Sequence, residues 1–289
     1  MQDCPDSADP CAVAAGSRID ALLKNSPLEP LETRILLGHT LQLTRVQLIT
    51  QSERALTAAE ARTLSALLRR RCNGEPIAYL VGTREFYGLP FEVTPEVLIP
   101  RPETELLVEL ALQRAAPAAR ILDMGTGSGA IAVALAHSRP DLALVALDVS
   151  AAALAVARRN ASRHGTAIRF LHGDWYRALH PEQDAGGERF ELIVANPPYI
   201  VAGDHHLAQG DLRFEPLGAL TDHADGLAAL RIIINGAAAH LAPHGWLLVE
   251  HGYDQAAPVR ALMLAAGFDA VQSWRDLAGI ERVSGGQRT

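Results

Sequence analysis

A glycine-rich loop, Gly125-Thr126-Gly127-Ser128-Gly129, is the feature of this sequence that most constrains its fold. It follows a short apolar segment at 121–124, predicted to be a strand, and it opens a predicted helix that runs to His137. Glycines at such a junction can adopt positive φ, and they let a ligand lie against bare backbone. Asp148 ends the next predicted strand, where a carboxylate can accept hydrogen bonds from ribose hydroxyls. The loop therefore predicts an adenosine-type cofactor, although the spacing Gly125-x-Gly127-x-x-Ala130 also fits a dinucleotide site.

The chain changes character along its length. Residues 17–72 carry apolar residues at helical spacing, and Thr57-Ala-Ala-Glu60 is a capping box at the start of the best-marked helix. Residues 77–100 combine aromatic residues with glycine and proline, which is typical of a hairpin and linker. From Arg120 onward, apolar strand segments alternate with helical ones, a pattern that predicts βαβ units and a parallel sheet. The predicted strands are 121–124, 142–147, 168–171, 192–195 and 246–250, with helices at 150–165 and 227–241 among others.

These patterns predict an α/β protein in three parts. The first part, 1–76, is a small helical domain, and the second, 77–100, is a β-hairpin linker. The third part, 101–289, contains the alternating strands and helices and the glycine-rich loop. We therefore expect the chemistry to lie in the third part, with the helical domain acting as an adapter.

Composition and charge exclude several classes of protein. The 289 residues have a formal net charge of −7, which gives no electrostatic footprint for a polyanion. No uncharged apolar run reaches the roughly 18 residues needed to span a bilayer, and Met1 to Pro10 lack a secretory signal. Cys4, Cys11 and Cys72 are odd in number and lack CxxC spacing, which disfavours a disulfide framework and a structural zinc site. We therefore expect a cytoplasmic protein.

A second motif, Asn196-Pro197-Pro198-Tyr199, directly follows the predicted strand 192–195. The two prolines fix φ and remove two donors, so the turn is expected to be rigid, with carbonyls that lack internal partners. Asn196 adds a side-chain carbonyl and Tyr199 adds an aromatic face, so the turn can grip a planar NH₂ group.

The two motifs together favour a methyltransferase over a dehydrogenase. Hydride transfer needs a proton donor or acceptor at the carbonyl, and no residue marks one. Methyl transfer from a sulfonium is an in-line displacement that needs alignment more than acid–base chemistry. An amide nitrogen is a poor nucleophile, but hydrogen bonds from its two hydrogens would orient it and shift electron density back onto nitrogen.

The sequence resembles the release factor glutamine methyltransferases from about Arg34 to Val283. The resemblance rests on blocks that stand in this chain as Gly74-Glu-Pro-Ile-Ala-Tyr-Leu80, Arg84-Glu-Phe-Tyr-Gly-Leu89, Ile99-Pro-Arg-Pro-Glu-Thr-Glu105, Ile121-Leu-Asp-Met-Gly-Thr-Gly-Ser-Gly129, Asn196-Pro-Pro-Tyr-Ile200, Phe214-Glu-Pro216 and Leu248-Val-Glu-His-Gly252. Many methyltransferases share the glycine-rich loop and the Asn-Pro-Pro-Tyr turn. The Pro100-Arg-Pro-Glu-Thr104 block is more specific to this family.

The resemblance implies a Rossmann-like class I methyltransferase domain of seven strands, which uses S-adenosylmethionine. It implies that the helical domain recognises class 1 peptide chain release factors, and that the methyl group goes to the N5 amide nitrogen of the glutamine in their Gly-Gly-Gln motif. The cofactor-binding residues would be Gly125, Thr126, Gly127, Ser128, Gly129, Asp148, Asp174, Trp175 and Asn196. Trp175 offers a face for the adenine, and Asp174 can accept from its exocyclic amine.

In the same resemblance the Asn-Pro-Pro-Tyr turn is the acceptor site. The catalytic residues would be Asn196, Pro197 and Tyr199, and the substrate-binding residues Asn196, Pro197, Pro198 and Tyr199. We expect a monomer that holds no metal and binds neither nucleic acid nor membrane directly.

Four other features have simpler explanations. His205-His206 is expected to lie in a solvated loop, and Arg69-Arg70-Arg71 to end a helix. Glu103 either starts a helix or faces the substrate. Gly285-Gly286-Gln287 repeats the substrate triplet, but it is expected to be a flexible tail.

Three alternative functions stay open from the residues alone. Adenine N6 also presents an NH₂ group to an Asn-Pro-Pro-Tyr turn, so a nucleic-acid amino-methyltransferase is the main one, although the net charge opposes it. A non-catalytic cofactor-binding module is the second, and the intact turn at 196–199 opposes it. A nicotinamide dehydrogenase is the third.

Overall fold

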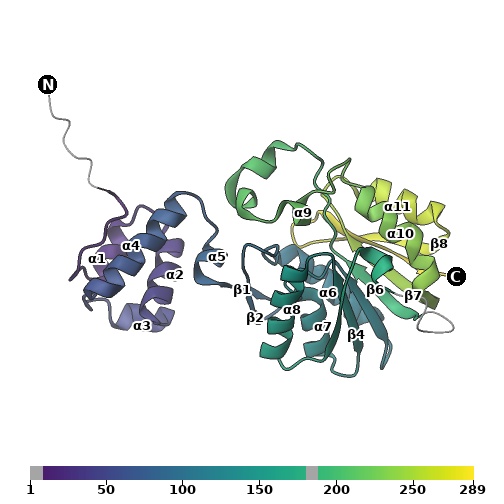
Figure 1. Cartoon of the computed structure of the whole chain (residues 1–289), viewed down its shortest axis with the longest axis horizontal. Helices are drawn as coiled ribbons and strands as arrows, with labels where there is room; N and C mark the ends of the chain where they lie inside the picture. The colour runs from purple at the N-terminus through teal and green to yellow at the C-terminus, as the bar shows by residue number, and fades with distance from the viewer. Residues whose placement is uncertain (1–8, 180–187) are drawn as a thin grey trace. The chain divides into compact units, whose positions relative to one another are not determined.

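The computed structural model describes residues 9–179 and 188–289, and the chain divides into two compact units, Met1–Gly82 and Thr83–Thr289 (Figure 1). The first unit contains α1 (Ile19–Asn25), α2 (Pro30–Leu41), α3 (Arg45–Thr50), α4 (Ala58–Cys72) and α5 (Ile77–Val81). In the described ranges, no helix has both the length and the apolar character to cross a membrane.

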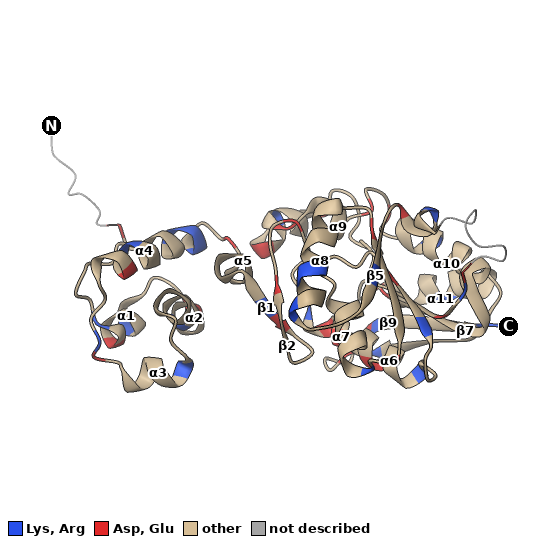
Figure 2. Ribbon diagram, turned by 60° about the horizontal axis from the view of Figure 1, so that its bottom comes forward, with Lys and Arg blue, Asp and Glu red and all other residues tan. Residues whose placement is uncertain are grey.

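Local sequence signals set the helix ends of the first unit. The predicted capping box is present: the Thr57 side chain accepts from the Glu60 backbone N–H, and the Glu60 carboxylate accepts from the Thr57 backbone N–H at 2.8 Å. Thr44 and Gln47 form a second box at the start of α3. Figure 2 shows acidic and basic residues interspersed over the elements. The three arginines that end α4 each pair with an acid, as Arg69–Asp9, Arg70–Glu75 and Arg71–Glu32.

The first unit extends beyond the predicted boundary at residue 76. Pro76 begins the short helix α5 instead of a hairpin, and Leu80 packs into the same core as Leu36, Leu37 and Leu64. Gly82 ends the helix in the left-handed region, at φ 71°. The segment 77–81 therefore belongs to the helical unit, because its apolar residues complete that unit's core.

A tight hairpin opens the second unit. Strands β1 (Thr83–Phe86) and β2 (Leu89–Glu92) pair antiparallel, with Phe86 opposite Leu89. Tyr87 and Gly88 between them both have positive φ, 52° and 75°, the conformation that a two-residue turn of type I′ needs. The predicted hairpin is therefore confirmed, although it starts at Thr83.

The core of the second unit is a seven-stranded sheet of order β5-β4-β3-β6-β7-β9-β8. Its strands are β3 (Arg120–Met124), β4 (Ala143–Asp148), β5 (Ile168–His172), β6 (Phe190–Ala195), β7 (Leu241–Glu250), β8 (Phe268–Arg275) and β9 (Glu281–Arg288). Neighbours from β5 to β7 are parallel, and β9 is antiparallel to both β7 and β8. The predicted α/β class and all five predicted strands are confirmed, with β4 including Asp148 and β7 starting earlier, at Leu241.

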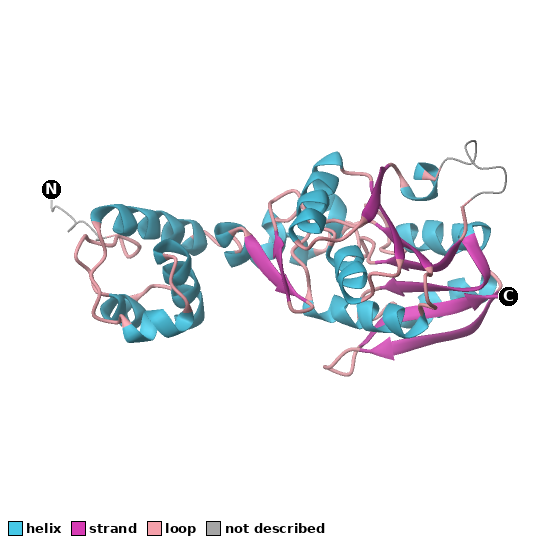
Figure 3. Cartoon of the chain, turned by 90° about the horizontal axis from the view of Figure 1, so that it is seen from below, coloured by secondary structure: helices cyan, strands magenta, loops and turns pink. Residues whose placement is uncertain are grey.

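Helices cover both faces of this sheet (Figure 3). Buried residues of α6 (Glu105–Arg114) and α7 (Ala130–Ser138) form one apolar cluster with the sheet, and those of α10 (Ala228–His240) and α11 (Ala256–Ala265) form the other. Along β6, Val194 belongs to the first cluster while Ile193 and Ala195 belong to the second, as expected for a strand buried on both faces. Strand order reverses around β3 and β6, and in open α/β sheets ligands bind outside the carboxyl ends of strands at such a point.

The expectation of a flexible tail at Gly285-Gly286-Gln287 is wrong. These residues lie inside β9, between β7 and β8, and both glycines are buried. A Cβ at Gly285 would come within 2.5 Å of the Leu248 side chain, and one at Gly286 within 2.9 Å of Phe268. The glycines are there because this central strand packs too closely against its neighbours for a side chain.

Candidate active site

A cavity of about 270 Å³ opens where β3, β4, β5 and β6 end. Its lining includes most of the residues expected to hold the cofactor, namely Gly125, Gly127, Asp148, Asp174, Trp175 and Asn196. Pro198 also lines it, from the Asn-Pro-Pro-Tyr turn at residues 196–199, which we call the acceptor turn. Val97 and Leu98, which precede α6, and Pro216 add apolar surface. The structure therefore brings together residues from six separate segments at the switch point of the sheet.

Three residues of the glycine-rich loop do not line this cavity. Thr126 and Ser128 line an adjacent cavity of about 50 Å³, and both are buried. The Thr126 hydroxyl donates to the Asp123 carboxylate at 2.6 Å. Gly129 has φ 82°, and a Cβ there would lie 3.1 Å from the Cβ of Ala157. These residues shape the loop and its packing on α8 (Ala151–Arg163).

Bare backbone forms part of the wall of the 270 Å³ cavity. Gly125 and Gly127 both have positive φ, 74° and 55°. No atom lies within 4 Å of the position that a Cβ would take on Gly127. At Gly125 that position is 3.7 Å from the Trp175 ring, so the ring lies across the loop. Trp175 itself has φ 46°, an uncommon conformation for a large side chain. A flat ligand group can lie on the backbone of this loop beside the indole.

Asp148 is buried at the end of β4, with 9% of its surface exposed. One carboxylate oxygen accepts from the Gly127 N–H at 2.9 Å and the other from the Ser150 N–H at 2.8 Å. Burial raises the pKa of Asp148, and these backbone donors oppose the rise. Each oxygen keeps a further lone pair, so the carboxylate can still accept hydrogen bonds from a ribose diol.

The acceptor turn, residues 196–199, joins the 270 Å³ cavity to a smaller one of about 70 Å³. Asn196 lines both cavities, whereas Pro197 and Tyr199 line only the smaller one. The Asn196 Nδ2 donates to the Thr104 hydroxyl at 3.1 Å. Its side-chain oxygen therefore points away from Thr104. Asn196 therefore lies at the junction of the two cavities, with its side-chain oxygen on the side away from Thr104.

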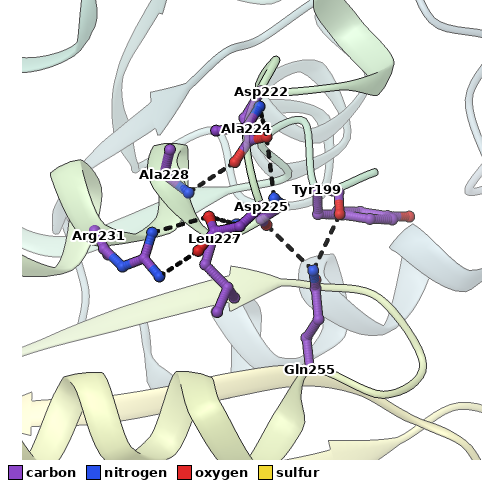
Figure 4. A network of polar contacts seen from close by, with 9 residues as sticks. Tyr199, Asp222, Ala224, Asp225, Leu227, Ala228, Arg231 and Gln255 are labelled. Carbon is purple, nitrogen blue, oxygen red and sulfur yellow. Dashed lines mark hydrogen bonds and ion pairs between the residues drawn. The ribbon is translucent and has the colours of Figure 1, made fainter. Parts of the chain in front are cut away.

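The prediction that the carbonyls of this turn lack internal partners is wrong for Tyr199. Figure 4 shows Gln255 reaching the Tyr199 backbone: its Nε2 donates to the Tyr199 carbonyl at 3.0 Å and to the Gly226 carbonyl at 3.2 Å. The Gln255 Oε1 accepts from the Gly252 N–H at 2.8 Å. The turn ends with a bonded carbonyl because Gln255, from the start of α11, is buried beside it.

The loop behind the turn is itself held by acids. Asp222 accepts from the backbone N–H groups of Ala224, Gly226 and Ala228, and Asp225 forms an ion pair with Arg231 (Figure 4). A Cβ on Gly226 would lie 2.6 Å from the Tyr199 carbonyl oxygen. The 222–228 loop therefore packs directly against the acceptor turn.

A larger polar cavity of about 580 Å³ lies on the other side of Tyr199. Its wall includes Arg101 and Glu103 from the Pro100–Thr104 block, Glu250 at the end of β7, and Arg282. Glu103 thus faces this cavity as well as starting a helical turn. Arg101 forms an ion pair with the buried Glu215, whose other oxygen accepts from the Ile99 N–H at 3.0 Å.

The pair His205-His206 lies in an exposed 3-10 turn, as expected for a solvated loop. Both rings approach the Asp204 carboxylate through Nδ1, at 3.5 and 2.8 Å. Of the residues that the structure describes, these three are the one group of His, Cys, Asp and Glu with ligand atoms close enough to share an ion.

The fold and this site define a class I S-adenosylmethionine-dependent methyltransferase. The residues fit that cofactor, since bare glycine backbone, an acid with spare lone pairs and an indole face line one cavity. Two family models match the chain: the PrmC N-terminal domain at residues 17–82 and the methyltransferase small domain at residues 102–211.

The chain belongs to the release factor glutamine methyltransferase family. It is 58% identical over 276 residues to the release factor glutamine methyltransferase of Burkholderia pseudomallei, which covers 92% of this chain and 94% of the relative. The protein of the same name from Bordetella pertussis is 55% identical over 269 residues, 92% of this chain and 97% of that one.

Solved structures agree on the fold. A methyltransferase from Pyrococcus furiosus has a TM-score of 0.53 at 18% identity, covering 78% of this chain and 98% of its own. The T. thermophilus 16S rRNA N2 G1207 methyltransferase, solved with AdoMet and guanosine, has a TM-score of 0.54 at 22% identity, covering 72% of this chain and 50% of its own.

Sequence reasoning missed three residues that contact the acceptor turn: Thr104, Glu250 and Gln255. Thr104 and Glu250 lie in two of the blocks that carry the family resemblance. Those blocks were a signal, but only the fold shows that they meet the turn. Gln255 lies outside every such block, and no local pattern marks it.

Proposed function

We propose that this chain transfers a methyl group from S-adenosylmethionine to the side-chain amide nitrogen of the glutamine in the Gly-Gly-Gln motif of class 1 peptide chain release factors. One observation carries the proposal most directly: Asn196 lines both the cofactor cavity and the acceptor cavity. The names of the relatives, from 58% identity downward, support the same substrate. Together with the net charge of −7, they favour a protein acceptor over adenine N6.

In this proposal the residues that line the 270 Å³ cavity bind different parts of the cofactor. Asp148 accepts from the ribose hydroxyls, the backbone at Gly125 and Gly127 lies under the methionine part, and Trp175 packs on the adenine. Asp174 accepts from the adenine amine. When bound, the cofactor supplies a methyl group carried on a sulfonium.

The acceptor turn orients the glutamine amide. The Asn196 Oδ1 and the Pro197 carbonyl accept the two amide hydrogens, while Pro198 and Tyr199 form the sides of the slot. These hydrogen bonds hold the nitrogen in line with the methyl group and shift electron density onto it. The proton leaves after the methyl group arrives, so the chain needs no strong base.

The helical unit recognises the release factor. It holds neither the glycine-rich loop nor the acceptor turn, and its helices cover residues 19–81. A chain starting at Thr83 should keep its affinity for S-adenosylmethionine and lose about tenfold or more in kcat/KM on the intact release factor. Calorimetry with the cofactor shows that the shortened chain is folded. An unchanged kcat/KM would then remove the helical unit from substrate recognition.

The enzyme works as a monomer in the cytoplasm and binds neither nucleic acid nor membrane directly. Its substrate is a translation protein, and its acidic charge opposes direct contact with nucleic acid. Sedimentation at working concentrations, with and without release factor, measures the oligomeric state. A self-associated enzyme would contradict the monomer.

Mass spectrometry of the methylated substrate tests the proposed function. A class 1 release factor is incubated with the enzyme and S-adenosylmethionine, digested, and its peptides are mapped. We expect one methyl group on the glutamine of the Gly-Gly-Gln motif, and none when that glutamine is replaced by asparagine. The proposal would be overturned by a methyl group at another residue. It would also be overturned if the enzyme binds the cofactor but methylates no residue of the release factor.

A further inference from the structure

Glu250 is a buried carboxyl group that the mechanism above does not use. It ends β7, is 1% exposed, and its Oε2 has no hydrogen-bond partner. Burial raises the pKa of Glu250 to about 7, although the Thr104 hydroxyl and Arg282 act in the opposite direction. Burying a carboxyl group with an unpartnered oxygen costs free energy, so its presence beside the acceptor turn indicates a functional role.

Two hydroxyl groups lie near Glu250: one belongs to Tyr199 at the end of the turn, and the other belongs to Thr104, which contacts Asn196 at its start. The Tyr199 hydroxyl lies 3.5 Å from its Oε1, at the long limit of a hydrogen bond. The buried Thr104 hydroxyl lies close enough to the carboxyl group to lower its pKa. The same Thr104 oxygen accepts from the Asn196 Nδ2 at 3.1 Å. Thr104 is therefore a neighbour of both the carboxyl group and Asn196, and Tyr199 faces the carboxyl group directly.

A hydrogen bond donated by Thr104 to Glu250 would fix the orientation of the Asn196 amide. A hydroxyl group has one hydrogen, and an ionised carboxylate can only accept. If Thr104 donates its hydrogen to Glu250, its oxygen must accept from Asn196, so Nδ2 faces Thr104 and Oδ1 faces the acceptor. If Thr104 turned its hydrogen toward Asn196, the amide would flip and present a donor to the substrate amide.

We propose that Glu250 and Thr104 are positioning residues for the acceptor turn, and that they hold the Asn196 Oδ1 toward the glutamine amide while Glu250 steadies Tyr199. This inference rests on the proposed function. It adds two residues to the acceptor site, from segments 92 and 54 positions away from Asn196 (196 − 104 and 250 − 196). Neither residue touches the reacting atoms, since both act through the turn.

The ionised form of Glu250 is the form that orients the turn. Below its pKa the carboxyl group must donate one hydrogen and can no longer accept equally from both hydroxyls. The charged and titratable groups around it are Tyr199, Glu103 and Arg282, with Arg101, His206 and Asp211 on the same cavity wall. Activity should therefore fall as the pH drops through about 7.

Single-turnover methylation of a release factor at saturating S-adenosylmethionine tests the inference. Thr104→Val keeps the shape and removes the hydroxyl group, so its rate should fall about tenfold, the effect of one buried hydrogen bond. Its KM for the release factor and its affinity for the cofactor should stay within about threefold of the wild-type values. Thr104→Ser restores the hydroxyl group and should recover most of the rate. Thr166→Val, which removes a hydroxyl bonded to the Ala161 carbonyl, is the control.

The pH profile separates positioning from a purely structural role. Glu250→Gln cannot titrate, so its rate should be lower than wild type near pH 8 but should lack the fall through about pH 7. The inference is overturned if Thr104→Val and Thr104→Ser are equally slow, if both match wild type, or if Glu250→Gln keeps the wild-type pH dependence. A wild-type enzyme inactive on every release factor would instead overturn the proposed function.

Discussion

The glycine-rich loop and the acceptor turn lie at the ends of neighbouring strands, but they are held in different ways. The loop after β3 is held mainly by residues close in sequence or on the next strand, as in Thr126 on Asp123 and Gly127 on Asp148. The turn after β6 is held by Thr104 before it and by Gln255 after it. The cofactor loop is largely a local structure, whereas the acceptor turn depends on distant parts of the chain.

This difference assigns the two regions separate tasks. The loop offers backbone and one carboxylate to a ligand, so changes there should alter affinity for the cofactor. In the proposed function the turn offers an oriented carbonyl oxygen to the reacting nitrogen, so changes there should alter the rate. The predictions below test that division.

The largest effect is expected at Asn196. Asn196→Ala should lower kcat by about 10² to 10³, the scale for losing one preorganised polar group. The variant removes the side-chain oxygen that accepts a hydrogen bond from the substrate glutamine amide. Asn196→Asp should keep partial activity, since its added charge stabilises the ground state more than a transition state in which positive charge disperses. Steady-state methylation of a release factor measures both. The exposed Asn235 supplies the control, as Asn235→Ala should match wild type.

The next effect is expected at Asp148. Asp148→Ala should weaken S-adenosylmethionine binding by about tenfold to a hundredfold, because each lost hydrogen bond to a charged acceptor costs about 1.5–3 kcal/mol and water replaces part of it. Titration calorimetry measures the affinity. The matched control is Asp141→Ala, at the exposed turn before β4, which should leave affinity unchanged. Equal affinities for wild type and Asp148→Ala would remove Asp148 from the ribose role.

A smaller effect is expected from a steric clash with the acceptor turn. Gly226→Ala would place a Cβ 2.6 Å from the Tyr199 carbonyl oxygen, so the turn must shift and the rate should fall about tenfold. Gly279→Ala has the same backbone penalty, with φ 79° against 78°, but open space around its Cβ. Both variants should lose similar stability. If both also lose the same activity, the contact with Tyr199 does not position the turn.

The smallest effect concerns stability. The pKa of Glu250 is raised to about 7 in the folded protein, above its value of about 4.3 in an unfolded chain. The contribution of Glu250 to the free energy of unfolding is therefore fully present below about pH 4, and it is lost as the pH rises through about 7. Glu250→Gln should gain about 2–3 kcal/mol in free energy of unfolding, relative to wild type, between about pH 5 and pH 8. Urea unfolding at both values measures it, and a constant difference would contradict the raised pKa.

The elements that could be predicted from the sequence are those with local signals. The Thr57–Glu60 capping box, the strand before Gly125 and the position of Asp148 each depend on residues a few positions apart. The Asn-Pro-Pro-Tyr motif likewise marks, from adjacent residues, the turn that directly follows β6. Those patterns also gave the α/β class, because alternating strand and helix periods leave few other arrangements.

The elements that could not be predicted depend on contacts between distant residues. The segment Gly285-Gly286 has the composition of a flexible tail, and only its neighbours β7 and β8 make it a buried strand. The segment 77–81 was predicted to belong to the hairpin linker because glycine and proline follow it, but its apolar residues form α5 and pack into the core of the helical unit. Likewise, no spacing links Gln255 to Tyr199, because the fold alone brings them together.

Single-turnover methylation of a release factor at saturating cofactor tests the division between loop and turn most directly. Once the cofactor is saturating, Asp148→Ala should react within about threefold of wild type, because its defect lies in affinity. Asn196→Ala should stay about 10² or more below wild type at every cofactor concentration, because its defect lies in orienting the acceptor. An Asn196→Ala enzyme that reacts within about threefold of wild type would contradict the role assigned to the acceptor turn.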